Sequence, residues 1–527
     1  MPDTPVLVDG GPLSLDEVAA VSRRDATVAL GEPARAAMAA SRATVDLLAA
    51  TTEPHYGIST GFGALAARSI EPDRRRTMQR RLIRSHAAGM GPPVEREVVR
   101  ALMLLRLRTL ATGRTGARVT VAEGLTGLLN AGITPVVPEH GSLGCSGDLA
   151  PLAHCALVLM GEGEVLDGDG GGPGRAGSGS DRGGKRPAAE ALAAAGLAPL
   201  ELAEKEGLAL INGTDGMLGM LALACVDLAG LLRVADVGAA MSVEGILGTD
   251  RAFLPELLAL RPHPGQAASA DNMLRLLDDS DIVASHREDD PRVQDAYSLR
   301  CAPQVNGAAR DTLAFARGVA ERELAAAIDN PVVLSDGRVA SNGNFHGAPL
   351  AFALDFLAIA AAEVGAIAER RTDRLLDVAR SHGLPAFLAD DPGVDSGLML
   401  AHYTQAAMVA ENRRLAAPAS VDSLPTSAMQ EDHVSMGWGA ARKLRTVVDN
   451  LVCILAVELV AGARALDLRA PLRPAPATGG VRDALRAGDV GGPGPDRHLA
   501  PELAGAAALV RSGAITDAAE AHAGELA

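Results

Sequence analysis

The residues most capable of unusual chemistry are Cys145, Ser146 and Gly147, within the stretch GSLGCSGDLAPLAH at 141–154. Gly147 has no Cβ to hinder its amide nitrogen, and Ser146 carries a hydroxyl that can leave. If the fold compresses this loop, the Gly147 nitrogen can reach the carbonyl carbon of Cys145 and close a five-membered ring. Loss of water from the ring and from Ser146 would leave an exocyclic methylene, an electrophile that no ordinary side chain supplies.

The surrounding residues predict a tight loop that runs into a helix. Asp148 is a good N-cap residue, Pro151 suits the first helical turn, and an apolar run follows. By itself, a Ser-Gly-Asp sequence is explained equally well as a helix-capping turn.

The composition indicates a globular, all-α protein. Of 527 residues, 48% are hydrophobic and only 2% aromatic, so the core must be built from Ala, Leu and Val, which suits closely packed helices. The net charge of −16 argues against a nucleic-acid or anionic-membrane partner. The longest apolar run, 451–462, is too short to span a bilayer, and the N-terminus does not resemble a signal peptide.

The cysteines predict neither a metal site nor a disulfide framework, because no two of them have CxxC spacing. They are Cys145, Cys155, Cys225, Cys301 and Cys453. We therefore expect no metal and a cytoplasmic location.

Other polar residues stand in segments whose function the residue types leave open. Three glycines in 57–63 indicate a loop or lid that carries Tyr56, either as a catalytic group or as a packing plug. A helix over 79–91 should end at glycine and carries His86, which is usually a structural histidine in such a place. Asn212, in an apolar run, needs a buried partner.

Length and periodicity predict the framework. Two helices are expected over 96–110 and 119–130, and a long one from Pro349 to Gly383, roughly 50 Å in length, which implies a helix bundle. Residues 166–187 are rich in Gly, Ser, Asp, Arg and Pro and predict a flexible insertion. We expect an N-terminal part over 1–205, a central long-helix bundle over 206–470 and a peripheral C-terminal cap over 471–527. The GxGxxG match inside the insertion has neither a preceding strand nor a following helix, so it predicts no dinucleotide site.

The 141–154 block and the YGISTGFG segment at 56–63 resemble the histidine and aromatic amino acid ammonia-lyases. Those enzymes form a methylidene-imidazolone group (MIO) from an Ala-Ser-Gly triplet, in place of which this chain has Cys145-Ser146-Gly147. Only the carbonyl of the first residue enters the ring, so this departure is tolerable. The resemblance implies the ammonia-lyase bundle fold, an internally formed MIO with no external cofactor, and a homotetramer with shared active sites.

The resemblance also implies roles for individual residues. Tyr56 would be the catalytic base, Tyr297 would lie beside the MIO, and Arg300 would bind the substrate carboxylate. Glu411 would be a further catalytic residue, at the side-chain end of the substrate together with His86. The remaining residues would bind or position the substrate: Asn212, Gln294, Phe345 and Gln430. From spacing alone, Glu411 is a solvated helix residue and 292–301 a solvated helix.

The histidine-specific members are the nearest match, through SHAAG at 85–89, Glu411 and QEDH at 430–433. The implied reaction is the non-oxidative deamination of L-histidine to urocanate and ammonia, a step of histidine catabolism. Departures at Asp215, Met429 and Trp438 bear on the substrate rather than on the reaction type. The alternatives are a tyrosine or phenylalanine ammonia-lyase or aminomutase, and a catalytically inactive helical scaffold.

Overall fold

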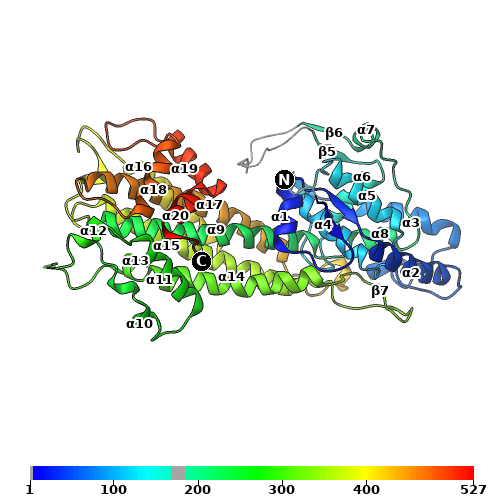
Figure 1. Cartoon of the computed structure of the whole chain (residues 1–527). Coiled ribbons are helices and arrows are strands. Elements are labelled where there is room, and N and C mark those ends of the chain that lie inside the picture. Colours follow the sequence, from blue (N-terminus) through cyan, green and yellow to red (C-terminus); the bar gives the residue numbers. More distant parts are fainter. Residues whose placement is uncertain (1–3, 168–183, 289) are drawn as a thin grey trace. The chain divides into compact units, whose positions relative to one another are not determined.

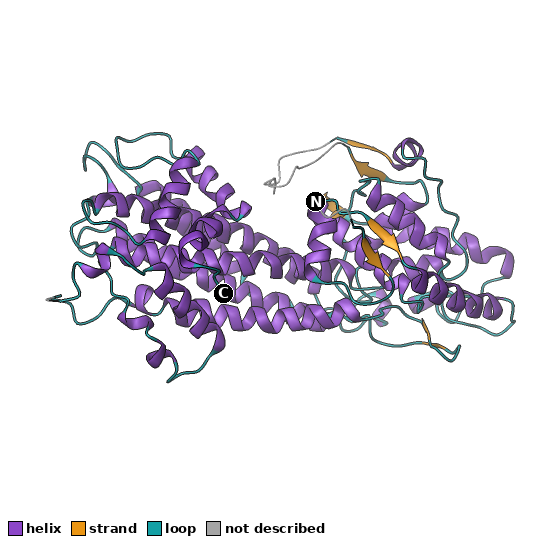
Figure 2. Cartoon of the chain, in the orientation of Figure 1, coloured by secondary structure: helices purple, strands orange, loops and turns teal. Residues whose placement is uncertain are grey.

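Helices make up most of the structure, a computed structural model that describes residues 4–167, 184–288 and 290–527 (Figures 1 and 2). The all-α prediction is confirmed. Most of the insertion expected at 166–187 lies outside the described residues, which show only the paired strands at its two ends.

The chain forms two compact units, each assembled from several stretches of sequence. Unit 1 comprises 1–226, 317–355 and 418–442, and unit 2 comprises 227–316, 356–417 and 443–527. The division into three parts expected from the sequence stays a prediction. Four long helices contribute residues to both units: α9 (Asp215–Gly245), α14 (Ala302–Ala325), α15 (Ala348–Leu376) and α17 (Gly437–Leu468).

Unit 1 contains shorter helices and pairs of short strands. Its helices are α1 (Leu15–Arg23), α2 (Glu32–Ala49), α3 (Arg75–His86), α4 (Arg96–Ala111), α5 (Val119–Asn130), α6 (Leu149–Leu159), α7 (Ala188–Ala194), α8 (Glu206–Ile211) and the 3-10 turns η1 (Gly63–Leu65), η2 (Pro72–Arg74) and η5 (Ser427–Met429). The parallel pair is β1 (Val6–Val8) with β2 (Val28–Leu30). The antiparallel pairs are β3 (Met90–Pro93) with β4 (Pro138–His140), β5 (Glu164–Leu166) with β6 (Lys185–Pro187), and β7 (Val332–Val333) with β8 (Val339–Ala340).

The named elements of unit 2, among its described residues, are helices and 3-10 turns joined by loops. Its own elements are α10 (Pro255–Leu258), α11 (Pro264–Leu276), α12 (Asp281–Ala284), α13 (Tyr297–Arg300), α16 (Met399–Leu415), α18 (Pro476–Ala487), α19 (Ala500–Ser512), α20 (Ala514–Ala523) and the 3-10 turns η3 (Arg251–Phe253) and η4 (Ala386–Leu388).

Local sequence explains several element boundaries. α1 begins with a capping box, in which Ser14 accepts from the Glu17 amide and the Glu17 carboxylate accepts from the Ser14 amide. α5 spans the expected residues, and α4 ends one residue later than expected. α3 ends at His86, and Ala87 rather than glycine follows it.

The long helix expected to reach Gly383 ends earlier, at Leu376. Its 29 residues correspond to about 43 Å. The next residue, Asp377, binds the amide of Ala379 and the guanidinium of Arg380, and these contacts stabilise a turn in place of a further helical turn.

Two helical segments, 206–245 and 348–376, are long and apolar enough to cross a membrane. In these segments, 72% and 67% of the most apolar window is buried inside the protein. We therefore interpret them as buried core helices, rich in Ala and Leu as the low aromatic content requires.

Candidate active site

The Cys145-Ser146-Gly147 triplet lies on a loop in unit 1 that crosses the turn before α9. Gly147 has φ +78°, and a Cβ there would lie 2.1 Å from the carbonyl oxygen of Gly213, so no other residue fits. The Ser146 hydroxyl donates to Asn212 Oδ1 at 2.7 Å, and Asn212 Nδ2 donates to the Asn330 carbonyl at 2.9 Å. The partner that a buried Asn212 requires is therefore the reactive serine itself.

Asp148 fixes the C-terminal side of this loop. Its amide donates to the Gly213 carbonyl at 2.7 Å, and its carboxylate accepts from the amides of Gly216 and Met217, each at 2.9 Å. The expected cap of α6 is thus only partly correct, because the carboxylate caps α9 instead of its own helix. Burial raises the pKa of Asp148 to about 7, against the lowering effect of these donors and of Ser142.

The N-terminal side of the loop is bound by residues just before and at the start of α17. Ser435 Oγ donates to the Gly144 carbonyl at 2.9 Å, and the Met436 amide donates to the Leu143 carbonyl at 2.8 Å. Trp438 Nε1 donates to the Glu139 carbonyl at 2.7 Å. The chain from Glu139 to Asp148 is therefore bound at both of its ends, with the triplet between them.

A buried ion pair lies behind the Asn212 turn. Arg106 of α4 contacts the Asp215 carboxylate and donates to the carbonyl of Ala209 at 3.0 Å. Both charged side chains are almost fully buried. Asp215 thus neutralises an arginine that supports the turn carrying Asn212.

Tyr56 lies on the glycine-rich segment, as expected. Its hydroxyl accepts from the Gly63 amide at 3.2 Å, and its ring packs edge-on against Phe62. The following 3-10 turn, η1, packs on η5 of the 426–431 hairpin. Tyr56 and that hairpin are consequently parts of one cluster.

Glu431 connects the hairpin to the triplet. Thr426 Oγ1 donates to Glu431 at 2.8 Å. Burial first, and then the charge of Glu431, raises the pKa of the Cys145 thiol to about 12. Burial lowers the pKa of His86, while the Leu82 carbonyl and Glu431 act in the opposite direction. The charge of Glu431 therefore acts on both Cys145 and His86. From the sequence, Glu431 was recognisable only as part of the QEDH string, with no role of its own.

The remaining predicted site residues are divided between the units. Phe345 is half-buried and Gln430 exposed, both in unit 1. Glu411 lies in unit 2, where its carboxylate accepts from Asn450 at 2.9 Å.

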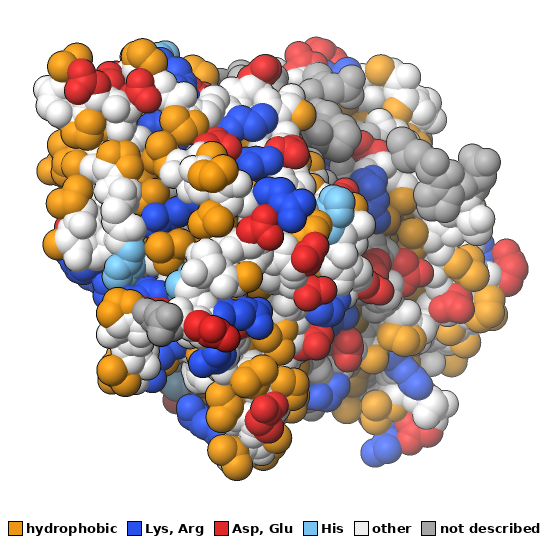
Figure 3. All heavy atoms as spheres, turned by 60° about the vertical axis from the view of Figure 1, so that its left-hand side comes forward, with side chains coloured by type: hydrophobic (Ala, Val, Ile, Leu, Met, Phe, Trp, Pro, Cys, Tyr) orange, Lys and Arg blue, Asp and Glu red, His pale blue; other side chains and the backbone are white. Residues whose placement is uncertain are grey.

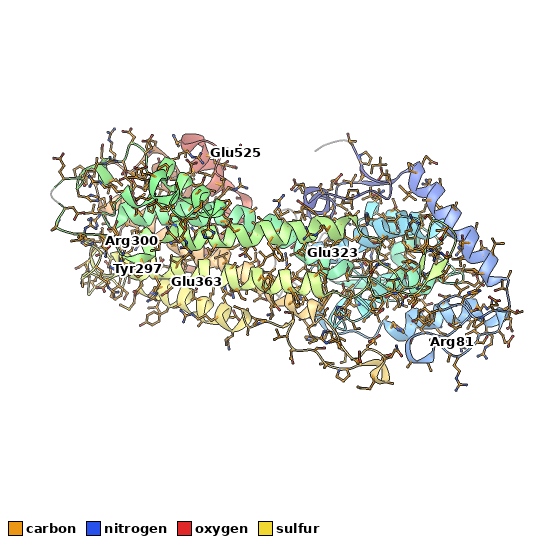
Figure 4. The ribbon with its side chains drawn as sticks, turned by 90° about the horizontal axis from the view of Figure 1, so that it is seen from below. Arg81, Tyr297, Arg300, Glu323, Glu363 and Glu525 are labelled. Atoms are coloured by element: carbon orange, nitrogen blue, oxygen red, sulfur yellow. The ribbon has the colours of Figure 1, made fainter. Side chains whose placement is uncertain are left out.

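Unit 2 also carries Gln294, Tyr297 and Arg300, at the start of α13. The Arg300 guanidinium carbon lies 4.8 Å from the centre of the Tyr297 ring, and the two side chains are neighbours in Figure 4. Arg300 Nε also donates to the Asp295 carbonyl at 2.9 Å. Tyr297 is 72% exposed and Gln294 is exposed.

The sequence model of the aromatic amino acid lyase family matches residues 13–487. The chain belongs to this family. It is 64% identical to a histidine ammonia-lyase of Streptomyces coelicolor, over 99% of each chain.

Two solved structures of family members have the same fold. A histidine ammonia-lyase from Trypanosoma cruzi is 38% identical, with a TM-score of 0.88 over 98% of this chain and 96% of that one. A tyrosine aminomutase from Streptomyces globisporus is also 38% identical, with a TM-score of 0.90 over 98% and 99%. The same backbone thus occurs in lyases and aminomutases, so the side chains must decide the reaction.

Proposed function

We propose that this lyase converts L-histidine to urocanate and ammonia, using an MIO formed from Cys145, Ser146 and Gly147. The observation that carries the proposal is the arrangement of the triplet, in which Gly147 crosses Gly213 without room for a Cβ while Ser146 is held by Asn212. The near-full-length relative named as a histidine ammonia-lyase supports the choice of substrate.

The residues around the triplet fit the group. The loop is bound at both ends, which supports the compression that ring closure needs, and the triplet needs nothing from outside the chain to supply the atoms. When formed, the MIO supplies an electrophilic methylene for the substrate amine.

The side chains of unit 1 provide the proton transfer and the positioning. Tyr56 takes the β-proton through its hydroxyl oxygen. In the structure this oxygen accepts a hydrogen bond from the Gly63 amide, which the substrate can replace. Asn212 places hydrogen-bonding groups beside the reacting atoms. In unit 2, the amino and carboxylate groups of the substrate are bound by Gln294, Tyr297 and Arg300. The Arg300 guanidinium can donate two parallel hydrogen bonds to the carboxylate.

His86 and Glu431 form hydrogen bonds with the imidazole of the substrate. A neutral His86, favoured by burial, can either donate to or accept from the substrate ring, and the Glu431 carboxylate accepts from an imidazole N–H. Glu411 of unit 2 keeps its proposed role at the side-chain end of the substrate, and Glu431 is a further glutamate proposed there, since its charge acts on Cys145.

We further propose a homotetramer in the cytoplasm. On unit 2, exposed apolar side chains of α14 and α15, among them Phe315, Phe356 and Ile359, surround a cavity of about 700 Å³ that Glu363 also lines (Figure 4). An apolar patch of this kind on a solvated protein marks an interface. The face shown in Figure 3 mixes Lys and Arg with Asp and Glu, which does not suit nucleic acid.

Initial rates on L-histidine, L-tyrosine and L-phenylalanine, with identification of the products, test the function. We expect urocanate from histidine, with a preference over phenylalanine on the order of 10³-fold. Faster turnover of tyrosine or phenylalanine would reject the substrate, and a β-amino acid product would identify an aminomutase. Light scattering tests the assembly, and a fully active monomer would contradict it.

A further inference from the structure

Trp438 contacts the N-terminal end of the ring-forming loop and also Gly216, a residue that binds the C-terminal end of the loop. On the N-terminal side, its indole N–H donates to the Glu139 carbonyl at 2.7 Å. On the C-terminal side, its six-membered ring lies so close to Gly216 that a Cβ there would be 2.5 Å from Cζ3. Gly216 is the residue whose amide binds the Asp148 carboxylate.

The surroundings make these contacts rigid. Trp438 is 3% exposed and is the second residue of α17. The two residues before α17, Ser435 and Met436, bind the carbonyls of Gly144 and Leu143. Both this segment and the loop belong to unit 1. An aromatic ring has few rotamers, so a buried one fixes the distance between the groups it contacts more strictly than a flexible side chain would.

We propose that Trp438 is a positioning residue for ring closure, which holds Glu139 and Gly216 at the separation that brings the Gly147 nitrogen onto the Cys145 carbonyl. This inference rests on the proposed function and adds to it how this chain matures.

The step that Trp438 serves is balanced within the triplet. The Gly147 nitrogen forms a bond to the Cys145 carbonyl carbon, and the carbonyl oxygen leaves as water with the hydrogens of the Gly147 and Ser146 amides. The Ser146 hydroxyl then leaves as a second water with the hydrogen on its own Cα. No oxidant, metal or other reactant is needed.

Because the chain has a single tryptophan, the indole N–H can be removed at this site alone. The full chain is synthesised in a cell-free system in which tryptophan is replaced by benzothienylalanine, whose sulfur takes the place of the N–H. Samples taken over time are digested, and mass spectrometry measures the fraction of the 141–154 peptide that has lost two waters.

Loss of one hydrogen bond should slow ring closure about fivefold. Trp438→Phe, which also replaces the indole by a smaller aromatic ring, should slow ring closure more. Leu128→Ala is the matched control, because Leu128 is fully buried in α5 of the same unit and has no contact with the loop among the hydrogen bonds and close approaches of the described residues. It should lower the melting temperature and leave the rate of ring closure unchanged.

Once formed, the ring is covalent, so turnover per ring-bearing site and KM for histidine should equal the wild-type values in every Trp438 variant. Ring closure at the wild-type rate in both tryptophan replacements would overturn the proposal, and so would an equal slowing by Leu128→Ala or a changed KM. A wild-type chain that never loses the two waters would instead reject the proposed function itself.

Discussion

The triplet loop of unit 1 and the Tyr297 segment of unit 2 differ in how much burial and how many contacts a single chain gives them. The loop is buried at Gly144, Gly147 and Asp148 and half-buried at Cys145 and Ser146, and hydrogen bonds hold both of its ends. The segment around Tyr297 is exposed, and Tyr297 has only Arg300 against its ring among the ring contacts of the described residues.

This difference has a chemical meaning. Ring closure must occur within one chain, so the chain alone has to hold the atoms in place. Binding an amino acid carboxylate needs a dry guanidinium, which an exposed segment provides only after another surface covers it. The comparison therefore favours an assembly in which α13 is covered, as in the proposed tetramer.

The largest expected effect is that of Ser146→Ala, on the self-contained side. The variant has no leaving hydroxyl, so no methylene can form, and kcat should fall on the order of 10³-fold or more. Peptide mapping should show residues 141–154 at the unmodified mass, whereas the tetramer and the melting temperature should be kept. Substantial turnover of histidine by this variant would separate the reaction from the triplet.

His86→Leu should have the next largest effect, at the side-chain end of the substrate. A leucine leaves the substrate imidazole without a partner on that side, so kcat/KM for histidine should fall about 10²-fold while the ring content stays complete. Preference for histidine over phenylalanine should decrease with it. Glu411→Gln, at the other residue proposed for this end of the substrate, should lower the same preference. An unchanged preference for histidine in His86→Leu would show that His86 does not bind the imidazole.

Arg300→Gln tests the exposed side directly. Charge-assisted hydrogen bonds are worth about 1.5–3 kcal/mol, so kcat/KM for histidine should fall about 10- to 150-fold. Inhibition by histamine, which lacks the carboxylate, should be unchanged. If histamine binding weakens equally, Arg300 supports the fold of the segment instead of the carboxylate.

The sequence predicted the parts of the site that are local. These are the tight loop of the triplet, the glycine-rich segment that carries Tyr56 and the partner that Asn212 needs. The roles of Tyr56, Asn212 and Arg300 come from the family resemblance and stay predictions. The sequence could not predict that Asp148 caps α9 or that Glu431 reaches Cys145, because these contacts depend on tertiary packing. The Trp438 contact joins residues 299 positions apart. The need for glycine at 213 is visible only in the structure, where a Cβ would collide with the buried Arg106 side chain.

The smallest expected effect concerns pH and compares one buried carboxylate in each unit. Burial raises the pKa of Glu244 in unit 2 to about 7, as it does for Asp148 in unit 1. Glu244 accepts from Ser280 at 2.6 Å, from the Ala475 amide at 2.7 Å and from Thr478 at 2.5 Å, which ties α9, α12 and α18 together.

Because the folded pKa of Glu244 lies above the unfolded value of about 4.5, its protonated form stabilises unit 2 below pH 4.5, and this stabilisation is lost as the pH rises through about 7. Glu244→Gln keeps an uncharged group at every pH, and Thr478 can accept from the new amide. Hydrogen exchange of peptides from α12 and α18 should therefore accelerate between pH 5 and pH 8 in wild type, after correction for the intrinsic rate, by an amount equivalent to about 1–3 kcal/mol. In the variant this pH dependence should be absent, while peptides of α6, next to Asp148, should keep theirs. An unchanged profile in α12 and α18 would mean that Glu244 has the same pKa in the folded and unfolded chain.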